Sequence, residues 1–326
     1  MWRYVQRIEP RRTRVHSIPR DDAPESNSAL THRALRFHLC DREQEIKKTG
    51  FQLGIALDGS KMSHKALEMG LSITKLAKLR KVQLLHVEDP KISAMAQSLE
   101  PVHIQHSAEL VTDKWGVLTK WHCTQQNPNR HPHETLVALA HKAKVDLLLL
   151  GSYGHTKDEE VLGGLFYYAL IHSRVSFMVV KSTSYISHIT HGRKESFLLW
   201  FDGSRTSLRA LAYCANYLVD PEDSLHLFNH SANEDPNDPF VEHRQLIESL
   251  PFKTTIHIRD NLAKSPVDHL ISVANSNQID ILVLGFGIKA ETGKDIMVEA
   301  TTLRCKQTVL VIKDLADDRE EEGGSP

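Results

Sequence analysis

"DGSKMSHKAL" runs from Asp58 to Leu67, and "DGSRTSLRAL" runs from Asp202 to Leu211. Each stretch directly follows a short apolar run, "FQLGIAL" in the first case and "FLLWF" in the second. From residue 61 to 79 the apolar side chains fall mostly at three- and four-residue steps, which is typical of one face of a helix. The chain therefore contains the same apolar strand, turn and helix start twice.

Five β-type runs lie in each half of the chain, and helix-period stretches separate most of them. Near-continuous apolar strands between helices predict a mostly parallel sheet that is covered on both faces. We therefore expect an α/β fold of two doubly wound, five-stranded parallel sheets, one from each copy, packed as a pseudo-dimer. The expected strands are residues 51–57, 82–87, 117–123, 146–151 and 177–181 in the first copy, and 197–201, 225–228, 254–258, 280–285 and 308–313 in the second.

Polar stretches flank the two copies and set the expected domain boundaries. We expect a first domain at 51–181, a linker at 182–195 and a second domain at 196–313. A polar leader at 1–50 and an acidic tail at 314–326 are expected to be disordered. The arginines of the leader suggest an organelle transit peptide, but its acidic residues argue against one.

The composition excludes several classes of partner. Lys and Arg number 40 against 41 Asp and Glu, which argues against a general attraction to nucleic acid or to an acidic membrane. The longest apolar runs are far shorter than the ~20 residues that cross a bilayer. The four cysteines are widely separated, which fits a reducing compartment. We expect a soluble, cytoplasmic protein that binds neither nucleic acid nor membrane.

Two loops at the expected carboxyl ends of strands are candidate ligand contacts. The turn at 58–60 reads either as a helix cap alone or as a cap that also contacts a ligand, and the sequence leaves both interpretations open. Gly151, Gly154 and Gly164 follow the spacing Gly-x2-Gly-x9-Gly. Glycines let the backbone approach a ligand closely, and its N–H groups can surround phosphates.

Together these features resemble the universal stress protein family in its tandem form. The resemblance rests on "ALDGS" at the end of the first strand, "LLHV" as the second, "DLLLLGSYG" as the fourth with its loop, and Gly164 ahead of the helix that leads to "FMVVK". It covers residues 51–181 well and 196–313 more loosely. It implies an adenine nucleotide α-hydrolase-like fold and a role in stress response or signalling.

The resemblance further implies a bound ATP or AMP, with or without Mg²⁺, in the first copy. Adenine and ribose would lie beside Asp58 and Val87, and the phosphates on the glycine loop. Leu165 departs from the family pattern, which has a hydroxyl residue there, and the acidic residues 158–160 would repel phosphates. The implied nucleotide-binding residues are Ala56, Asp58, Ser60, Val87, Gly151, Gly154, Gly164 and Leu165.

The second copy departs further, because "GFGIKAETGKDI" stands in place of the glycine pattern. We expect this copy to be degenerate and its Asp202 turn to serve mainly as a helix cap. The alternative for the whole chain is a structural or interaction protein that keeps the fold and binds no nucleotide.

No catalytic residue can be nominated, because no Gly-x-Ser-x-Gly elbow occurs and no triad can be assembled from the sequence. Slow ATP hydrolysis is the most that the resemblance allows. His122, His133 and His141 invite a metal interpretation, but a His-x-His in a Pro-containing loop is typical of an exposed loop, and we expect no metal site. Trp115 and Trp121 are expected to pack in the core.

The fifth strands, "FMVVK" and "TVLVIK", are apolar and would lie at sheet edges. Apolar edges tend to aggregate unless another strand pairs with them. We therefore expect residues 178–180 to lie beside residues 310–312, with the two copies related by a pseudo-twofold axis. A protein partner or a homo-oligomer remains open.

Overall fold

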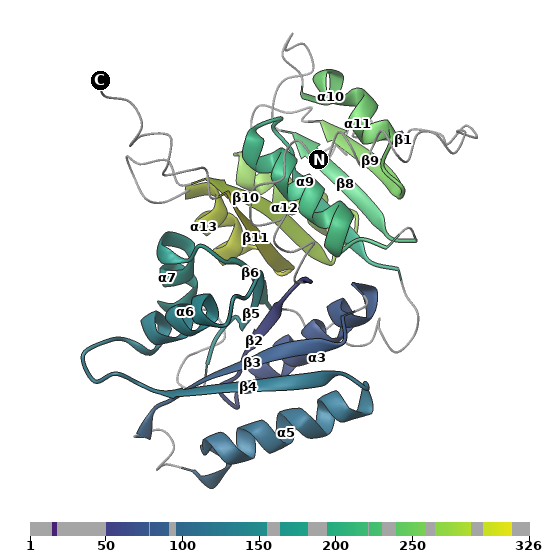
Figure 1. Ribbon diagram of the computed structural model, residues 1–326. Helices are drawn as coiled ribbons and strands as arrows, with labels where there is room; N and C mark the ends of the chain where they lie inside the picture. Colours follow the sequence, from purple (N-terminus) through teal and green to yellow (C-terminus); the bar gives the residue numbers. More distant parts are fainter. Residues whose placement is uncertain are drawn as a thin grey trace, which may run out of the picture.

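The computed structural model describes residues 15–17, 50–77, 79–90, 96–154, 164–181, 194–220, 222–229, 239–258, 265–287 and 296–314. Its strands form one sheet in the order β1-β9-β8-β7-β10-β11-β6-β5-β2-β3-β4 (Figure 1). The strands are β1 (Val15–Ser17), β2 (Leu53–Ala56), β3 (Lys81–Glu88), β4 (Leu118–Gln125), β5 (Leu147–Gly151), β6 (Ser176–Val180), β7 (Ser196–Trp200), β8 (Ser224–Asn229), β9 (Lys253–Ile258), β10 (Ile281–Gly287) and β11 (Thr308–Asp314).

All ten strands expected from the sequence are present as β2 to β11, each within two residues of its expected ends. Strand β1 was not predicted; it pairs antiparallel with β9, and it belongs to the leader. The rest of the leader, residues 182–193 of the linker and residues 315–326 of the tail lie outside the described residues.

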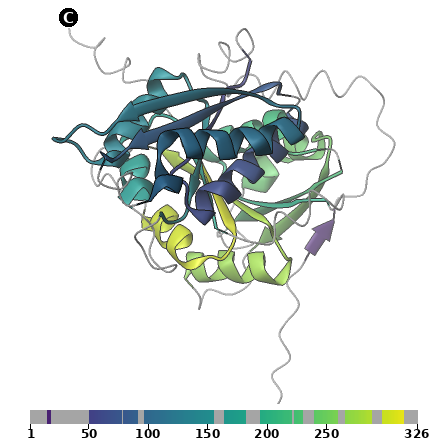
Figure 2. The same ribbon diagram turned by 90° about the horizontal axis from the view of Figure 1, so that it is seen from below.

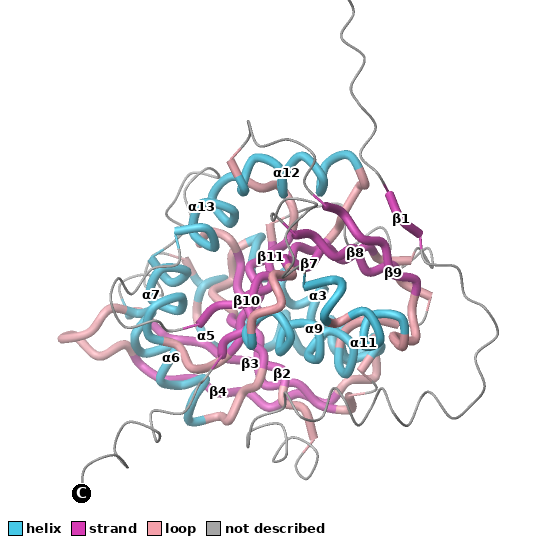
Figure 3. The backbone as a smooth tube through the Cα atoms, turned by 90° about the horizontal axis from the view of Figure 1, so that it is seen from above, coloured by secondary structure: helices cyan, strands magenta, loops and turns pink. Residues whose placement is uncertain are grey.

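Helices cover both faces of the sheet, so that it has a hydrophobic core on each side. One face packs against α3, α5, α9 and α11, and the other against α6, α7, α12 and α13. Figure 3 shows α12 and α13 on one side of the strands and α9 and α11 on the other. The helices are α3 (Lys61–Leu76), the 3-10 turn η1 (Gln97–Leu99), α5 (Pro101–Lys114), α6 (Pro132–Lys142), α7 (Gly164–His172), α9 (Arg205–Tyr217), α10 (Pro239–Glu242), α11 (Arg244–Glu248), α12 (Pro266–Ser276) and α13 (Ile296–Arg304).

The prediction of two separate sheets is wrong, because the strands form a single continuous sheet. Within each half the strands are parallel, but β6 and β11 meet antiparallel, with Met178 opposite Leu310 and Val179 opposite Val309. Each fifth strand covers the edge of the other, so neither apolar edge is left open. The halves lie side by side as a result, blue and teal against green and yellow in Figure 1, and Figure 2 views them from below with the first half in front.

The same carboxylate contact begins the central strand of each half. The backbone N–H of Gln52 donates to Asp146 at 2.8 Å, and that of Ser196 donates to Asp280 at 3.0 Å. Asp146 directly precedes β5 and Asp280 directly precedes β10. The Asp of "DLLLLG" and of "DILVLG" therefore fixes two neighbouring strands at the edge opposite the candidate ligand loops.

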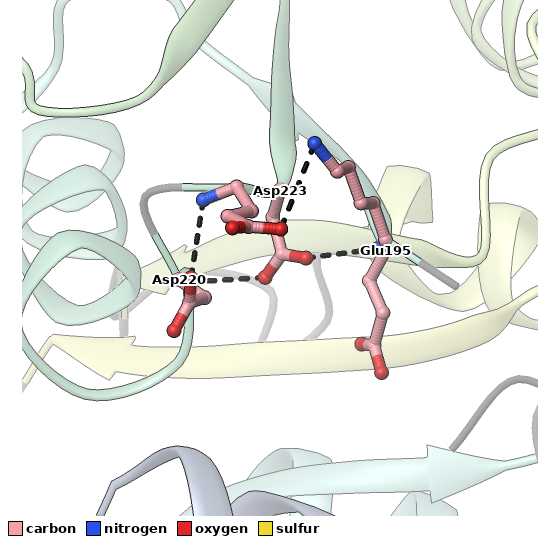
Figure 4. A network of polar contacts seen from close by, with 5 residues as sticks. Glu195, Asp220 and Asp223 are labelled. Atoms are coloured by element: carbon pink, nitrogen blue, oxygen red, sulfur yellow. Dashed lines mark hydrogen bonds and ion pairs between the residues drawn. The ribbon is translucent and has the colours of Figure 1, made fainter. Parts of the chain in front are cut away.

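Asp223 makes a related contact between the starts of β7 and β8. The backbone N–H groups of Glu195 and Asp220 donate to its two oxygens at 2.8 and 2.9 Å (Figure 4). Burial raises the pKa of Asp223, and the two N–H donors act in the opposite direction. We interpret this network as structural, because both oxygens are engaged by backbone at the amino ends of the strands.

A lysine at the end of each fifth strand crosses to the other half. The Lys313 amine donates to the carbonyl of Leu170 near the end of α7 and lies 4.1 Å from the ring centroid of Phe286. The Lys181 amine donates to the carbonyls of Thr302 and, at 3.1 Å, of Cys305 at the end of α13. Both amines donate to carbonyls that a helix end leaves unpaired.

Among the described residues, no helix combines the length and the apolar character needed to span a membrane.

Candidate functional site

The Asp58 turn joins β2 to α3 and presents a carboxylate at the carboxyl end of the sheet. One oxygen of Asp58 accepts from the N–H of Ser60 at 2.9 Å, and the Ser60 hydroxyl accepts from the N–H of Ser63 at 3.1 Å. Gly59 has a φ of +80°, which an L side chain rarely adopts. The turn is thus a fixed helix cap, which both sequence interpretations require.

Two glycines of the loop pattern lie against this turn. A Cβ added to Gly154 would lie 2.9 Å from the second carboxylate oxygen of Asp58. A Cβ on Gly151 would lie 2.9 Å from Cβ of Met62 and 3.1 Å from the backbone nitrogen of Ser63. Gly151 lets α3 begin directly on the end of β5, and Gly154 brings the backbone close to the Asp58 carboxylate.

Gly164 and Leu165 begin α7, and their described neighbours come from other elements. A Cβ on Gly164 would lie 3.6 Å from Nδ1 of His133 at the start of α6, an ordinary van der Waals contact. Leu165 is partly buried against the core between the sheet and helices α6 and α7. An apolar side chain therefore points into the core at the position where the family pattern has a hydroxyl. Residues 155–163, including the acidic residues 158–160, lie outside the described residues.

Ala56 and Val87 end their strands on the same face of the sheet. Ala56 is 8% exposed, and the half-buried Val87 packs against the same core as Leu165. Figure 1 shows the two strands, β2 and β3, side by side, with α3 following β2. The structure thus brings Ala56, Asp58, Ser60, Gly151 and Gly154 together, with Val87 on the neighbouring strand.

His86 is a buried polar residue that the sequence reasoning missed. Its Nδ1 lies 2.7 Å from the carbonyl oxygen of Leu57, directly before the Asp58 turn, and its ring stacks on Trp121 at 5.7 Å. Its Nε2 is buried without a hydrogen-bond partner among the described residues. The pattern "LLHV" held a signal for it, because a histidine in a fully buried strand needs a polar partner. We interpret His86 as a support for the turn.

The second half repeats the turn and places a threonine beside it. The N–H of Ser204 donates to Asp202 at 3.0 Å, and Gly203 has a φ of +73°. A Cβ on Gly285 would lie 2.7 Å from Cγ2 of Thr206, and one on Gly287 would lie 3.2 Å from its Oγ1. Thr206 therefore borders both glycines at the end of β10. Residues 288–295 lie outside the described residues.

Two of the histidines that suggested a metal, His122 and His141, are engaged in hydrogen bonds. Nε2 of His122 lies 2.8 Å from the side-chain oxygen of Gln83, and Nε2 of His141 accepts from the N–H of Arg174 at 3.2 Å. Burial lowers the pKa of both imidazoles, assisted by nearby Lys and Arg side chains. In the part of the chain that the structure describes, no three His, Cys, Asp or Glu side chains are placed to hold a metal ion.

Trp115 and Trp121 are partly buried and pack against the core on the α3 and α5 face. The prediction that they are packing residues is confirmed.

Comparison with known proteins places the fold. The model of the universal stress protein family matches residues 52–181. A universal stress protein from Archaeoglobus fulgidus superposes with a TM-score of 0.64 at 17% identity, covering 80% of this chain and 98% of that one. A candidate universal stress protein from Pseudomonas aeruginosa gives a TM-score of 0.54 at 14% identity, covering 80% and 92%. No curated protein matches the chain. The family match ends with the first half, whereas the likeness of fold extends into the second.

Proposed function

We propose that residues 50–181 bind an adenine nucleotide, ATP or AMP, and that the chain is a tandem universal stress protein acting as a nucleotide-responsive binding protein in stress response or signalling. The observation that carries the proposal is the meeting of Gly154 with Asp58 at the carboxyl ends of β5 and β2. In an open parallel sheet, ligands lie outside the carboxyl ends of the strands, beside the amino ends of helices.

The geometry supports a division of the ligand between two parts of this edge. Adenine and ribose contact Ala56, Asp58 and Val87, where a carboxylate can accept from ribose hydroxyls. The phosphates lie along Gly154 and Gly164, whose missing side chains expose main-chain N–H groups.

Asp58 bears the same charge as the phosphates, so charge neutralisation has to come from elsewhere. The described residues offer no metal cage of their own. Mg²⁺ would therefore enter on the phosphates of ATP, as is usual for this ion, and supply charge neutralisation there.

A second candidate function is a scaffold that retains the fold and binds no nucleotide. Leu165 favours it, because this side chain packs into the core where a hydroxyl would otherwise donate to phosphate. The two functions differ in one measurable property, the affinity for nucleotide.

Isothermal titration of the full chain with ATP and AMP, with and without Mg²⁺ at millimolar ligand, separates them. We expect Asp58→Ala to weaken binding and Asp202→Ala to leave it unchanged. Each aspartate accepts a hydrogen bond from the backbone N–H two residues later. Both substitutions therefore remove the same turn contact, and they differ only in the half that they affect. Absence of heat with either nucleotide would exclude the nucleotide function and leave the scaffold.

A further inference from the structure

A row of four rings borders the third glycine of the loop pattern. His131 and His133 stack at 5.0 Å with an interplanar angle of 9°, His133 meets Tyr168 at 5.0 Å, and Tyr168 meets His172 at 4.5 Å. The two first rings come from the start of α6 and the other two from α7. The row therefore joins the two helices on either side of Gly164.

His133 is the member of this row that touches the loop pattern. Its Nδ1 and Cε1 lie 3.6 and 3.7 Å from where a Cβ of Gly164 would be, so only the missing side chain separates imidazole from backbone. An anion resting on the Gly164 main chain would lie within reach of this ring. Imidazole suits the purpose, because it donates a hydrogen bond in either protonation state and carries a positive charge when protonated.

The structure also shows why such a donor is needed. Leu165 contributes no hydroxyl, and its side chain packs into the core. Asp58 places a negative charge at the other end of the site. Leu165 therefore gives the phosphate end no side-chain donor, and His133 on α6 is placed to supply one.

The other described titratable groups near His133 are few. His131 stacks on it, Tyr168 lies against it, and Glu134 accepts from the backbone N–H of His131 at 3.4 Å. His172 lies beyond Tyr168 at the far end of the row.

We propose that His133 is a phosphate-binding residue that replaces the hydroxyl missing at Leu165 and makes the site prefer nucleotides with more phosphates. This inference rests on the proposed nucleotide function and assigns its phosphate end to a helix outside the loop pattern.

The test is titration of the full chain with ATP, AMP and adenosine. For His133→Ala we expect the affinity for ATP to fall about tenfold, the loss typical of a hydrogen bond to a charged group. The affinity for adenosine should stay unchanged. His172→Ala is the matched control, since it shortens the same row at its far end. Circular dichroism melts of each variant check that the fold is intact.

The outcomes separate the two proposals. ATP binding with unchanged affinity in His133→Ala would overturn the role of His133 and leave the nucleotide function standing. Equal losses in His133→Ala and His172→Ala, or an equal loss for adenosine, would also overturn it, because the effect would then not concern phosphate. Binding of none of the three ligands by the unaltered chain would overturn both proposals.

Discussion

The two halves of the chain begin their first helix in the same way and differ in what lies beside that helix. Asp58 and Asp202 each accept from the N–H two residues later, and Gly151 and Gly285 each let a helix begin on the end of a strand. Thereafter the halves diverge: Gly154 faces a carboxylate, whereas Gly287 faces the Thr206 hydroxyl. Features that both halves share are explained by packing and capping. The evidence for a ligand therefore lies in the features that only the first half has.

Among the changes proposed here, a substitution of Lys313, at the junction of the two halves, should have the largest effect on the free energy of unfolding. Lys313 is 1% exposed, and burial lowers its pKa from 10.5 to about 7. The unfolded chain then holds this proton between pH 7 and 10.5 while the folded chain does not. The free energy of unfolding should therefore rise with pH across this window, by at most about 5 kcal/mol, and be lowest below pH 7.

Lys313→Met should flatten that rise, since Met fills similar space without titrating. Urea unfolding at pH 7 and pH 9.5 measures it, and Lys181→Met should flatten the rise as well, because burial also lowers the pKa of this half-buried lysine. An identical pH slope in Lys313→Met and the unaltered chain would contradict the assignment.

A pair of side chains on neighbouring strands is a second difference between the halves. Gln83 and His122 meet at 2.8 Å in the first half, and His226 and His257 meet at 2.7 Å at the corresponding positions of the second. Burial lowers the pKa of His226 and of His257 to about 4, and nearby positive groups add to the effect. Both imidazoles are therefore neutral in the folded chain at pH 6.

Between pH 6.5 and 4 the unfolded chain binds protons that the folded chain excludes, so stability should fall as the pH falls. His226→Gln recreates the first-half pair and should reduce this slope by one proton, about 1.4 kcal/mol per pH unit. Chemical unfolding at pH 4.5, 5.5 and 6.5 measures the slope. A slope that does not change would show that the pair already titrates normally.

Replacing Gly151 or Gly285 by alanine should lower the stability of the fold by a similar amount. Ala at Gly151 or Gly285 would press on the backbone of the helix start, at 3.0 Å from the carbonyl carbon of Met62 and 2.9 Å from the carbonyl oxygen of Thr206. Overpacking of this kind costs about 1–3 kcal/mol of stability. Thermal and urea unfolding of Gly151→Ala and Gly285→Ala check it, and a loss in only one of them would break the equivalence of the halves.

The local pattern of the sequence predicted much of the fold and less of the site. The repeated Asp-Gly-Ser turn and all ten strands of the two halves follow from apolar runs, turn residues and caps, which act over a few positions. The apolar edges of β6 and β11 also predicted that these two strands lie together, as they do, but not that their hydrogen bonds join the two expected sheets into one. His133 lies beside Gly164 only through the packing of α6 on α7, and Thr206 borders Gly287 only in the folded chain. Such contacts depend on tertiary geometry, which spacing along the chain does not contain.

The stoichiometry of nucleotide binding tests the central difference between the halves most directly. Calorimetric titration of the full chain with ATP should give one site per chain. Gly154→Val should abolish it by placing a branched side chain against Asp58, and Gly287→Val should leave it intact. Two equivalent sites per chain, or unchanged affinity for ATP in Gly154→Val, would contradict a single nucleotide site in the first half.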